Sequence, residues 1–249
     1  WTPMPHVPSS SPFCMKLETY LRMAGINYQV DTDHELAKWK KSPTAKLPCI
    51  AYRAEIIADS SKCIDWISKQ FGKSLDVELT PREVATSILL KRTIEESVYF
   101  IMGYYRWIAD AGWNYIRHAY FPDMPAILNP IITPHIRRDM LRAFHGQGIA
   151  RYSPEDVAKM GRENIDAVAA YCRPDAHEKF FFGHGHPTSI DAVMLGFLGN
   201  ILFVEIDSPI RQHLLLKEDL VRYVKSLMLR YYPELAPLAF SLLPPDVRS

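Results

Sequence analysis

The sequence predicts an α+β fold in which a unit of mixed strands and helices precedes an all-helical unit. Two observations support this prediction. Short strand-like segments alternate with helical patterns in the first third of the chain. After about residue 80 the strand signals cease, and helical patterns continue to the end of the sequence. We therefore expect a first domain at residues 1–75 and a second domain at residues 80–249.

The first unit begins with a proline-rich segment and a helix. Residues 1–11 are typical of a strand remnant followed by a loop. Ser11 can cap a helix, and Pro12 suits its first position. Apolar residues then recur at helical spacing, and Gly25 can end the helix in a left-handed conformation. Residues 28–32 have the pattern of a strand.

A hairpin and another amphipathic helix complete the first unit. A polar helical patch at residues 35–41 precedes two short apolar runs, 47–52 and 55–58, which a turn would join as a β-hairpin. Asp59 then caps a helix whose apolar residues recur on one face. The predicted order is strand, helix, strand, helix, strand, strand, helix.

Capping sequences mark the helices of the second unit. Thr80-Pro81-Arg82-Glu83 and Ser153-Pro154-Glu155-Asp156 are capping boxes, and the first opens a long helix to about residue 110. Thr188-Ser189-Ile190-Asp191 caps an apolar helix, and residues 220–231 form the last amphipathic helix. The sequence leaves the structure of residues 113–134 open.

The composition is that of a folded globular protein. Of the 249 residues, 48% are hydrophobic and 23% are charged, and the formal net charge is +1. This balance gives no basis for a nucleic acid or an anionic membrane as the main partner. The longest apolar stretch, residues 192–204, is interrupted by Asn200 and is too short to span a bilayer, so we expect no transmembrane segment.

The cysteines favour a reducing compartment. They form no CxxC pair and no Cys/His spacing typical of a zinc site, so we expect no metal and a cytoplasmic location. The first residue is Trp1 rather than Met, and we expect the natural N-terminus to be missing. The four cysteines are Cys14, Cys49, Cys63 and Cys172.

Three local features suggest a binding site. At Ser11-Pro12-Phe13-Cys14 a helix N-terminus offers amide donors and a partial positive charge, and a cap hydroxyl there can donate to a thiolate. The alternative is that Ser11 is only a cap, because Thr80-Pro81 and Ser153-Pro154 start helices in the same way.

The second feature is Lys46-Leu47-Pro48-Cys49, where a proline opens a strand. A cis Leu47-Pro48 bond would present the Leu47 backbone to an extended ligand, whereas an ordinary trans proline is the alternative. The third feature is Asp59-Ser60. Here the helix N-terminus and Ser60 can hold a carboxylate while Asp59 receives an ammonium group, although capping alone also explains both residues.

Together these motifs resemble the glutathione S-transferase superfamily. The string from Ser11 to Gly25 is similar to the failed-axon and metaxin-like branch, and Gly185 to Ala192 resembles the capping box of the superfamily's helical domain. The resemblance covers nearly the whole chain. It implies a thioredoxin-like domain (βαβαββα) to about residue 75, followed by an all-α domain.

The resemblance also implies roles for the site residues. Ser11 occupies the place of the first cysteine in the Cys-Pro-Phe-Cys motif of glutaredoxin-like relatives, which implies activation of the glutathione thiol rather than disulfide exchange. Leu47 would pair its backbone with the cysteinyl unit beside a cis Pro48. Asp59 and Ser60 would hold the γ-glutamyl group, and Lys46 would reach the glycine carboxylate.

One departure from the family concerns the serine. The first strand is truncated, and the loop before Ser11 is unusually rich in proline. That loop can reposition the catalytic hydroxyl, so Ser9 and Ser10 are rivals to Ser11.

Other candidates have competing interpretations. Cys14 is expected to be a packed thiol rather than a reactive one. His184-Gly185-His186 is expected to be a loop rather than a metal site. Tyr104, Tyr105 and Trp107 either belong to the core or, together with Arg106, are candidates to line a cleft for an apolar co-substrate.

The function that these residues and the resemblance imply is glutathione conjugation, the chemistry of detoxification. The bound glutathione thiolate attacks an apolar electrophile, and the protein is expected to be a homodimer. A non-catalytic adaptor of the same fold is one alternative. A glutathione-dependent thiol oxidoreductase is another, but a serine at position 11 cannot form the mixed disulfide.

Overall fold

The computed structural model describes residues 4–31, 47–120, 127–173 and 175–248. Its first helix confirms the predicted capping. Helix α1 spans Pro12–Met23 and begins at the N-cap Ser11, whose hydroxyl oxygen accepts from the Cys14 amide at 3.4 Å. Gly25 follows with a positive φ of 60°, a conformation that costs glycine little.

A hairpin and a helix follow, as predicted. Strands β1 (Cys49–Tyr52) and β2 (Glu55–Ala58) are antiparallel, with Cys49 opposite Ala58 and Tyr52 opposite Glu55. Helix α3 spans Ser60–Phe71, with Asp59 as its N-cap and the left-handed Gly72 as its C-cap.

The prediction of a strand at residues 28–32 is wrong for residues 28–31, which form no strand. Thr32 lies outside the described residues. A strand needs a hydrogen-bonded neighbour. The proline-rich segment before α1 instead turns back on itself, with the Met4 amide donating to the Val7 carbonyl at 3.2 Å. The Tyr28 hydroxyl bonds the Glu18 carboxylate at 2.7 Å, on α1.

The described part of the first unit therefore has two β-strands and an isolated bridge, rather than the four strands expected. The expected helix at residues 35–41 and Lys46 lie outside the described residues.

A long helix opens the second unit. It runs from Pro81 to Ile108 as α4 (Pro81–Arg92), the π-helical η1 (Thr93–Val98), α5 (Tyr99–Gly103) and the π-helical η2 (Tyr104–Ile108). The predicted length is confirmed. The helix is not uniformly α, because two of its segments are π-helical, with hydrogen bonds between residues five apart. No pattern in the sequence predicts these π-helical segments.

The remaining helices complete the second unit. The open region 113–134 contains the end of α6 and the start of α7. In order, the elements are α6 (Asp110–Ala119), α7 (Asn129–Gln147), the 3-10 turn η3 (Ile149–Arg151), α8 (Pro154–Tyr171), α9 (Ser189–Leu202), α10 (Pro209–Leu215), α11 (Glu218–Tyr231), α12 (Ala236–Ser241) and α13 (Pro245–Arg248).

The predicted caps hold the starts of these helices. At α4 the Thr80 amide donates to Glu83 at 2.8 Å and the Glu83 amide to the Thr80 hydroxyl at 3.3 Å, a reciprocal capping box. At α9 the Thr188 amide donates to the buried Asp191 carboxylate at 2.8 Å. At α8 Ser153 caps the helix by accepting from the Asp156 amide at 3.1 Å, but the predicted capping box is wrong. The Asp156 carboxylate receives the Ser153 hydroxyl at 2.8 Å, and no bond from the Ser153 amide to it occurs among the described residues.

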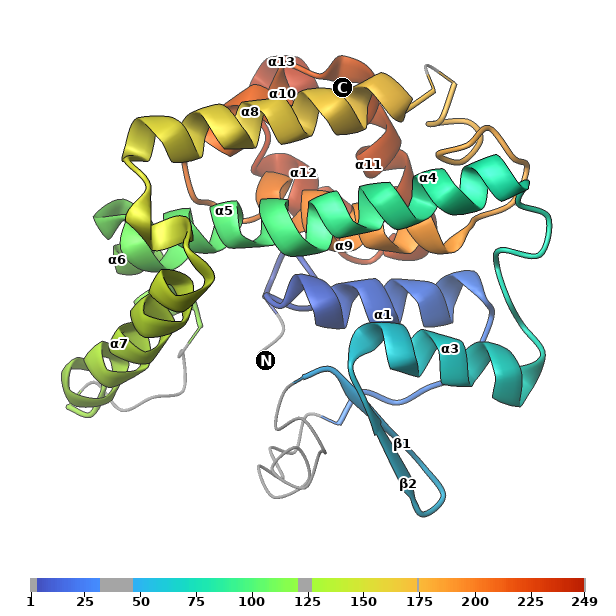
Figure 1. Cartoon of the computed structure of the whole chain (residues 1–249), viewed down its shortest axis with the longest axis horizontal. Coiled ribbons are helices and arrows are strands. Elements are labelled where there is room, and N and C mark those ends of the chain that lie inside the picture. Colours follow the sequence, from blue (N-terminus) through green and yellow to red (C-terminus); the bar gives the residue numbers. More distant parts are fainter. Residues whose placement is uncertain (1–3, 32–46, 121–126, 174, 249) are drawn as a thin grey trace.

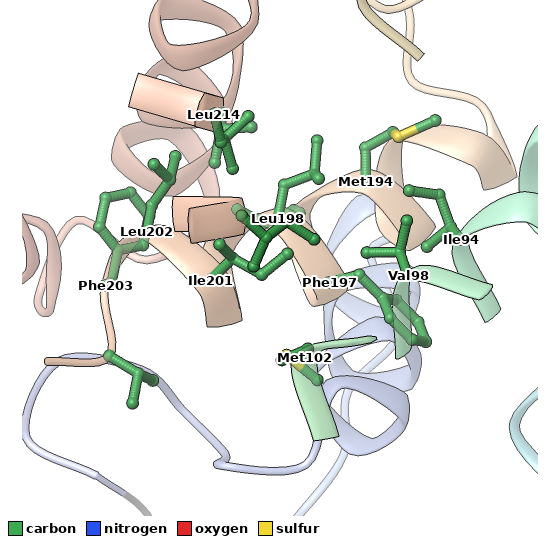
Figure 2. Packing of buried hydrophobic residues seen from close by; sticks show 14 of the residues in the cluster. Ile94, Val98, Met102, Met194, Phe197, Leu198, Ile201, Leu202, Phe203 and Leu214 are labelled. Atoms are coloured by element: carbon green, nitrogen blue, oxygen red, sulfur yellow. The ribbon is translucent and has the colours of Figure 1, made fainter. Parts of the chain in front are cut away.

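Helix α9 is the centre of the hydrophobic core. It is buried on all sides, and Figure 2 shows Ile94, Val98 and Met102 of the long helix beside Phe197 and Leu198 of α9. A smaller hydrophobic cluster lies between α1 and α3, and it includes Leu17, Tyr20, Leu21, Cys63, Ile64 and Ile67.

Helix α1 lies between α3 and the helical layer, as Figure 1 shows. Its backbone comes very close to that of α9. A Cβ atom added to Gly196 would lie 2.8 Å from both the Pro12 carbonyl oxygen and the Lys16 amide nitrogen. The packing of the two units on each other therefore requires a glycine at this position.

Among the described residues, no helix combines the length and the hydropathy that crossing a bilayer would require.

Candidate functional site

The serine loop, which we define as residues 8–11, precedes α1. The Ser9 hydroxyl oxygen accepts from the Ser11 amide at 3.2 Å. Ser9 and Ser10 are buried, and the Ser10 hydroxyl has no hydrogen-bond partner among the described residues. Ser11 is half-buried, and its oxygen accepts from the Cys14 amide. The side chains of Ser9 and Ser11 also hydrogen-bond the Cys14 thiol, and these bonds oppose the rise that burial causes in its pKa.

The second predicted feature lies at the start of the hairpin. The Leu47-Pro48 peptide bond is cis. The Asp59 amide donates to the Pro48 carbonyl oxygen at 3.2 Å, which places the cap of α3 beside this proline.

The third feature is the N-terminus of α3. Asp59 has a positive φ of 78°, and its carboxylate accepts from the Ser61 amide at 3.0 Å and the Lys62 amide at 3.1 Å. Ser60 is buried. Asp59 therefore acts as the N-cap, as predicted, and Ser60 lies in the first turn beside it.

Lys16 is a site residue that the sequence analysis missed. Its side chain is 1% exposed, and its Nζ donates to the hydroxyls of Ser60 and Ser61, both at 3.1 Å, and to the Glu95 carboxylate at 2.6 Å. Burial lowers the pKa of Lys16, while the charge of Glu95 raises it. A lysine at helical spacing between Phe13 and Tyr20 was the available signal.

Arg106 and Asn200 attach the serine loop to the second unit. The Arg106 guanidinium donates to the Ser10 carbonyl at 2.9 Å and to the Asn200 carbonyl and side-chain oxygens at 2.8 and 3.1 Å. The Asn200 side-chain amide donates to the Ser9 carbonyl at 3.2 Å. Arg106, a candidate for the cleft of an apolar co-substrate, is buried and is not among the described residues that line the cavity described below.

The thiols of the first unit are unsuited to nucleophilic attack. Cys14 is half-buried rather than fully packed, and burial raises its pKa. Burial also raises the pKa of Cys49, and that of Cys63 to about 12. A thiol with a raised pKa is mostly protonated near neutral pH, so these groups contain little thiolate.

A cavity of about 520 Å³ lies between α1, residues 26–31 and the hairpin. Ser9, Cys14, Leu47 and Pro48 are among the described residues that line it, whereas Ser11, Asp59 and Ser60 are not. The predicted binding residues therefore divide between the wall of this cavity and the adjacent N-terminus of α3.

The three aromatic candidates lie in the core of the second unit. Tyr104, Tyr105 and Trp107 are at most 8% exposed, and they are not among the described residues that line the cavity. Their assignment to a co-substrate pocket stays a prediction.

His184 and His186 stack on each other and bond the carboxylates of Glu83 and Glu78, at 3.0 and 2.9 Å. Within the described residues, no group of three or more metal-binding side chains occurs.

The architecture is a small thioredoxin-like unit joined to a helical unit, and comparisons with known proteins define its class. Residues 12–112 match the glutathione S-transferase N-terminal domain, and residues 176–227 match the glutathione S-transferase C-terminal domain. An isoprene-epoxide--glutathione S-transferase of Rhodococcus sp. (strain AD45) is 31% identical over 204 residues, which cover 78% of this chain and 82% of that protein. The chain therefore belongs to the glutathione S-transferase family.

Two further matches refine this assignment. Failed axon connections of Drosophila melanogaster is 28% identical over 246 residues, which confirms the resemblance to that branch; the match covers 92% of this chain but 56% of that longer protein. The solved structure of maleyl pyruvate isomerase, a bacterial zeta-class glutathione S-transferase, has the same fold. Its TM-score is 0.52 at 14% identity, over 95% of this chain and 96% of that one.

Proposed function

We propose that this protein binds glutathione in its first unit and conjugates it through the thiol to an apolar electrophile. The observation that best supports the proposal is the pair of helix N-termini beside the cis Pro48. Ser11 caps α1, where its hydroxyl already hydrogen-bonds a sulfur, that of Cys14, and Asp59 caps α3 directly before Ser60. The two ends suit the sulfur and the γ-glutamyl group of one extended peptide.

Each predicted residue has a role in this proposal. Asp59 receives the γ-glutamyl ammonium group, Ser60 donates to its carboxylate, and the Leu47 backbone pairs with the cysteinyl unit. Lys46 lies outside the described residues, and its contact with the glycine carboxylate is proposed from the family resemblance alone.

The chemistry requires a thiolate at Ser11. The glutathione thiol gives its proton to solvent, and the Ser11 hydroxyl and the N-terminus of α1 stabilise the resulting anion. The sulfur then attacks an electrophilic carbon. For an epoxide, the class named for the Rhodococcus relative, the C–S bond forms as the C–O bond breaks, and the alkoxide takes a proton from water. The enzyme orients the two reactants.

Two finer points belong to the same proposal. The protein acts in the cytoplasm, as its unpaired cysteines suggest. It acts as a homodimer, which the exposed apolar side chains of α4, Val84, Ile88 and Leu89, support.

A second candidate is a non-catalytic binding module of the same fold. The observation that favours it is that Ser11 is not among the described residues lining the cavity. Binding without turnover, or no glutathione binding by the folded protein, would be the result expected of such a module.

Calorimetric titration of glutathione, followed by a conjugation assay with a small epoxide, tests the proposal. Wild type should bind glutathione with a Kd between about 1 μM and 1 mM. The Asp59→Asn variant retains a capping side chain that tolerates positive φ but loses the charge, so its affinity should fall about tenfold.

Ser11→Ala should bind glutathione but lose about a hundredfold in kcat, as expected when one donor to a developing anion is removed. Ser153→Ala is the matched control, because Ser153 caps α8 in the same Ser-Pro manner. Equal kcat values for Ser11→Ala and wild type would remove Ser11 from the mechanism.

A further inference from the structure

Arg106 is a buried cation whose acceptors are all neutral. Its side chain lies in the interior of the second unit, in a residue that is 5% exposed. Its hydrogen bonds go to two backbone carbonyls and one amide oxygen. None of the ion pairs formed within the described residues includes Arg106. A buried charge is normally paired, because its removal from water is costly.

The bonds of Arg106 and Asn200 fix consecutive residues of the serine loop. Arg106 binds the carbonyl of Ser10, and Asn200 binds the carbonyl of Ser9. The Ser9 hydroxyl in turn receives the Ser11 amide. Side chains of the second unit thus hold Ser9 and Ser10 directly, and they hold Ser11 through one further bond.

The charge of Arg106 reaches beyond its bonding partners. Burial raises the pKa of Tyr99, Tyr115 and Tyr120, and the positive charge of Arg106 opposes this rise at all three hydroxyls. Among the acidic groups of the described residues, Glu205 acts on Tyr115, but it is exposed to solvent. A charge in a region of low dielectric acts over a longer distance than a solvated one.

We propose that Arg106, held by Asn200, is a positioning residue of the site: it fixes the serine loop and contributes a buried positive charge that favours a thiolate bound at Ser11. This inference rests on the proposed function, since it concerns the glutathione thiol. It adds a source of thiolate stabilisation that lies in the helical unit, in addition to the hydroxyl and the helix N-terminus.

The test measures the pKa of the bound glutathione thiol from its thiolate absorbance in the ultraviolet as a function of pH. In Arg106→Met the thiol pKa should rise by about one unit, which is roughly a tenfold loss of thiolate below that pKa. Affinity for S-methylglutathione, which has no ionisable thiol, should change by less than about threefold, since its γ-glutamyl contacts lie at α3. Arg106→Lys retains the charge and should keep most of the wild-type thiol pKa.

Arg211→Met is the matched control. Arg211 is also partly buried and donates to two carbonyls, of Leu202 at 3.2 Å and Leu242 at 2.8 Å, but to none of the serine loop. In Arg211→Met the pKa of the bound glutathione thiol should equal that in wild type. An unchanged thiol pKa in Arg106→Met would overturn the inference. So would equal losses of S-methylglutathione affinity and of thiolate, which a merely structural role predicts.

A second variant covers the case in which Arg106→Met does not fold. Asn200→Asp places a carboxylate beside the guanidinium, so it neutralises the charge and should raise the thiol pKa in the same direction. Wild type that binds no glutathione would overturn the proposed function together with this inference. Wild type that binds, with variants whose thiol pKa is unchanged, would overturn the inference alone.

Discussion

Two buried cations hold α1 and the loop before it, and they differ in what surrounds them. Lys16 extends from α1 to the N-terminus of α3 and pairs with the Glu95 carboxylate at 2.6 Å. Arg106 extends from the long helix to the serine loop and has only neutral acceptors among the described residues. The field of a paired charge is weak at a distance, because its partner cancels most of it, whereas the field of an unpaired charge extends further. The difference teaches that Lys16 orients Ser60 and Ser61, while Arg106 can act electrostatically.

The largest expected effect is the loss of stability in Lys16→Met. This change leaves Glu95 largely buried without its cation, so the free energy of unfolding should fall by about 3–5 kcal/mol. Arg106→Met leaves only carbonyl and amide oxygens unpaired and should cost about 1–3 kcal/mol. Urea unfolding of the two variants measures both values.

The double variant Lys16→Met/Glu95→Gln sharpens this comparison. Removing both charges should restore part of the stability lost in Lys16→Met, because no buried charge is then left unpaired. Equal losses in Lys16→Met and Arg106→Met, with no recovery in the double variant, would contradict the distinction between the two cations.

The next effect concerns the close backbone contact between α1, which carries Lys16, and α9. In Gly196→Ala the new Cβ meets the Pro12 carbonyl and the Lys16 amide, so overpacking should lower the free energy of unfolding by about 1–3 kcal/mol. Gly199→Ala on the same helix is the control. Its Cβ would first meet the flexible end of Met15, at 3.2 Å, and its cost should be smaller. The reverse order in urea unfolding would show that α1 can shift without cost.

The smallest effect comes from a charge pair at the surface. The Glu78 carboxylate raises the pKa of His186 above its usual value of 6.5. A raised folded-state pKa gives stability that is fully present below the unfolded pKa and is lost as the pH rises through the folded one. Wild type should therefore have a higher Tm than His186→Gln below about pH 6, and the two should converge above pH 8.

Glu78→Gln should remove the same pH-dependent difference, because it deletes the partner rather than the histidine. A Tm difference that grows as the pH rises would contradict the assigned direction of the His186 pKa.

The sequence predicts a structural feature well when the residues that determine it are close together along the chain. The caps Ser11, Asp59 and Thr80 were predictable because each bonds an amide two or three residues away. The strand at residues 28–32 was not, because strand formation depends on a neighbour that the proline-rich segment does not provide.

The residues of the candidate site also fall into those that the sequence predicts and those that it does not. The glutathione motifs are short, so the predicted residues Ser11, Pro48 and Asp59 could be named before their structure was known. The buried cations could not be, since Lys16 and Glu95 are 79 positions apart and Arg106 and Ser10 are 96 positions apart. Only packing brings such partners together, and a lysine on an apolar helix face is a weak signal of it.

The close contact of α1 with α9 limits how far the two halves of this chain can be exchanged. By sequence α1 belongs to the first unit, but Gly196, Asn200 and Arg106 of the second unit fix its start. A chimaera that took residues 1–75 from one relative and the remainder from another would transfer the hairpin of β1 and β2 intact. It would keep the serine loop in place only if both parents had matching residues at these three positions. Recombination within the family is therefore constrained by the α1–α9 contact, although the linker between the two units lies elsewhere in the sequence.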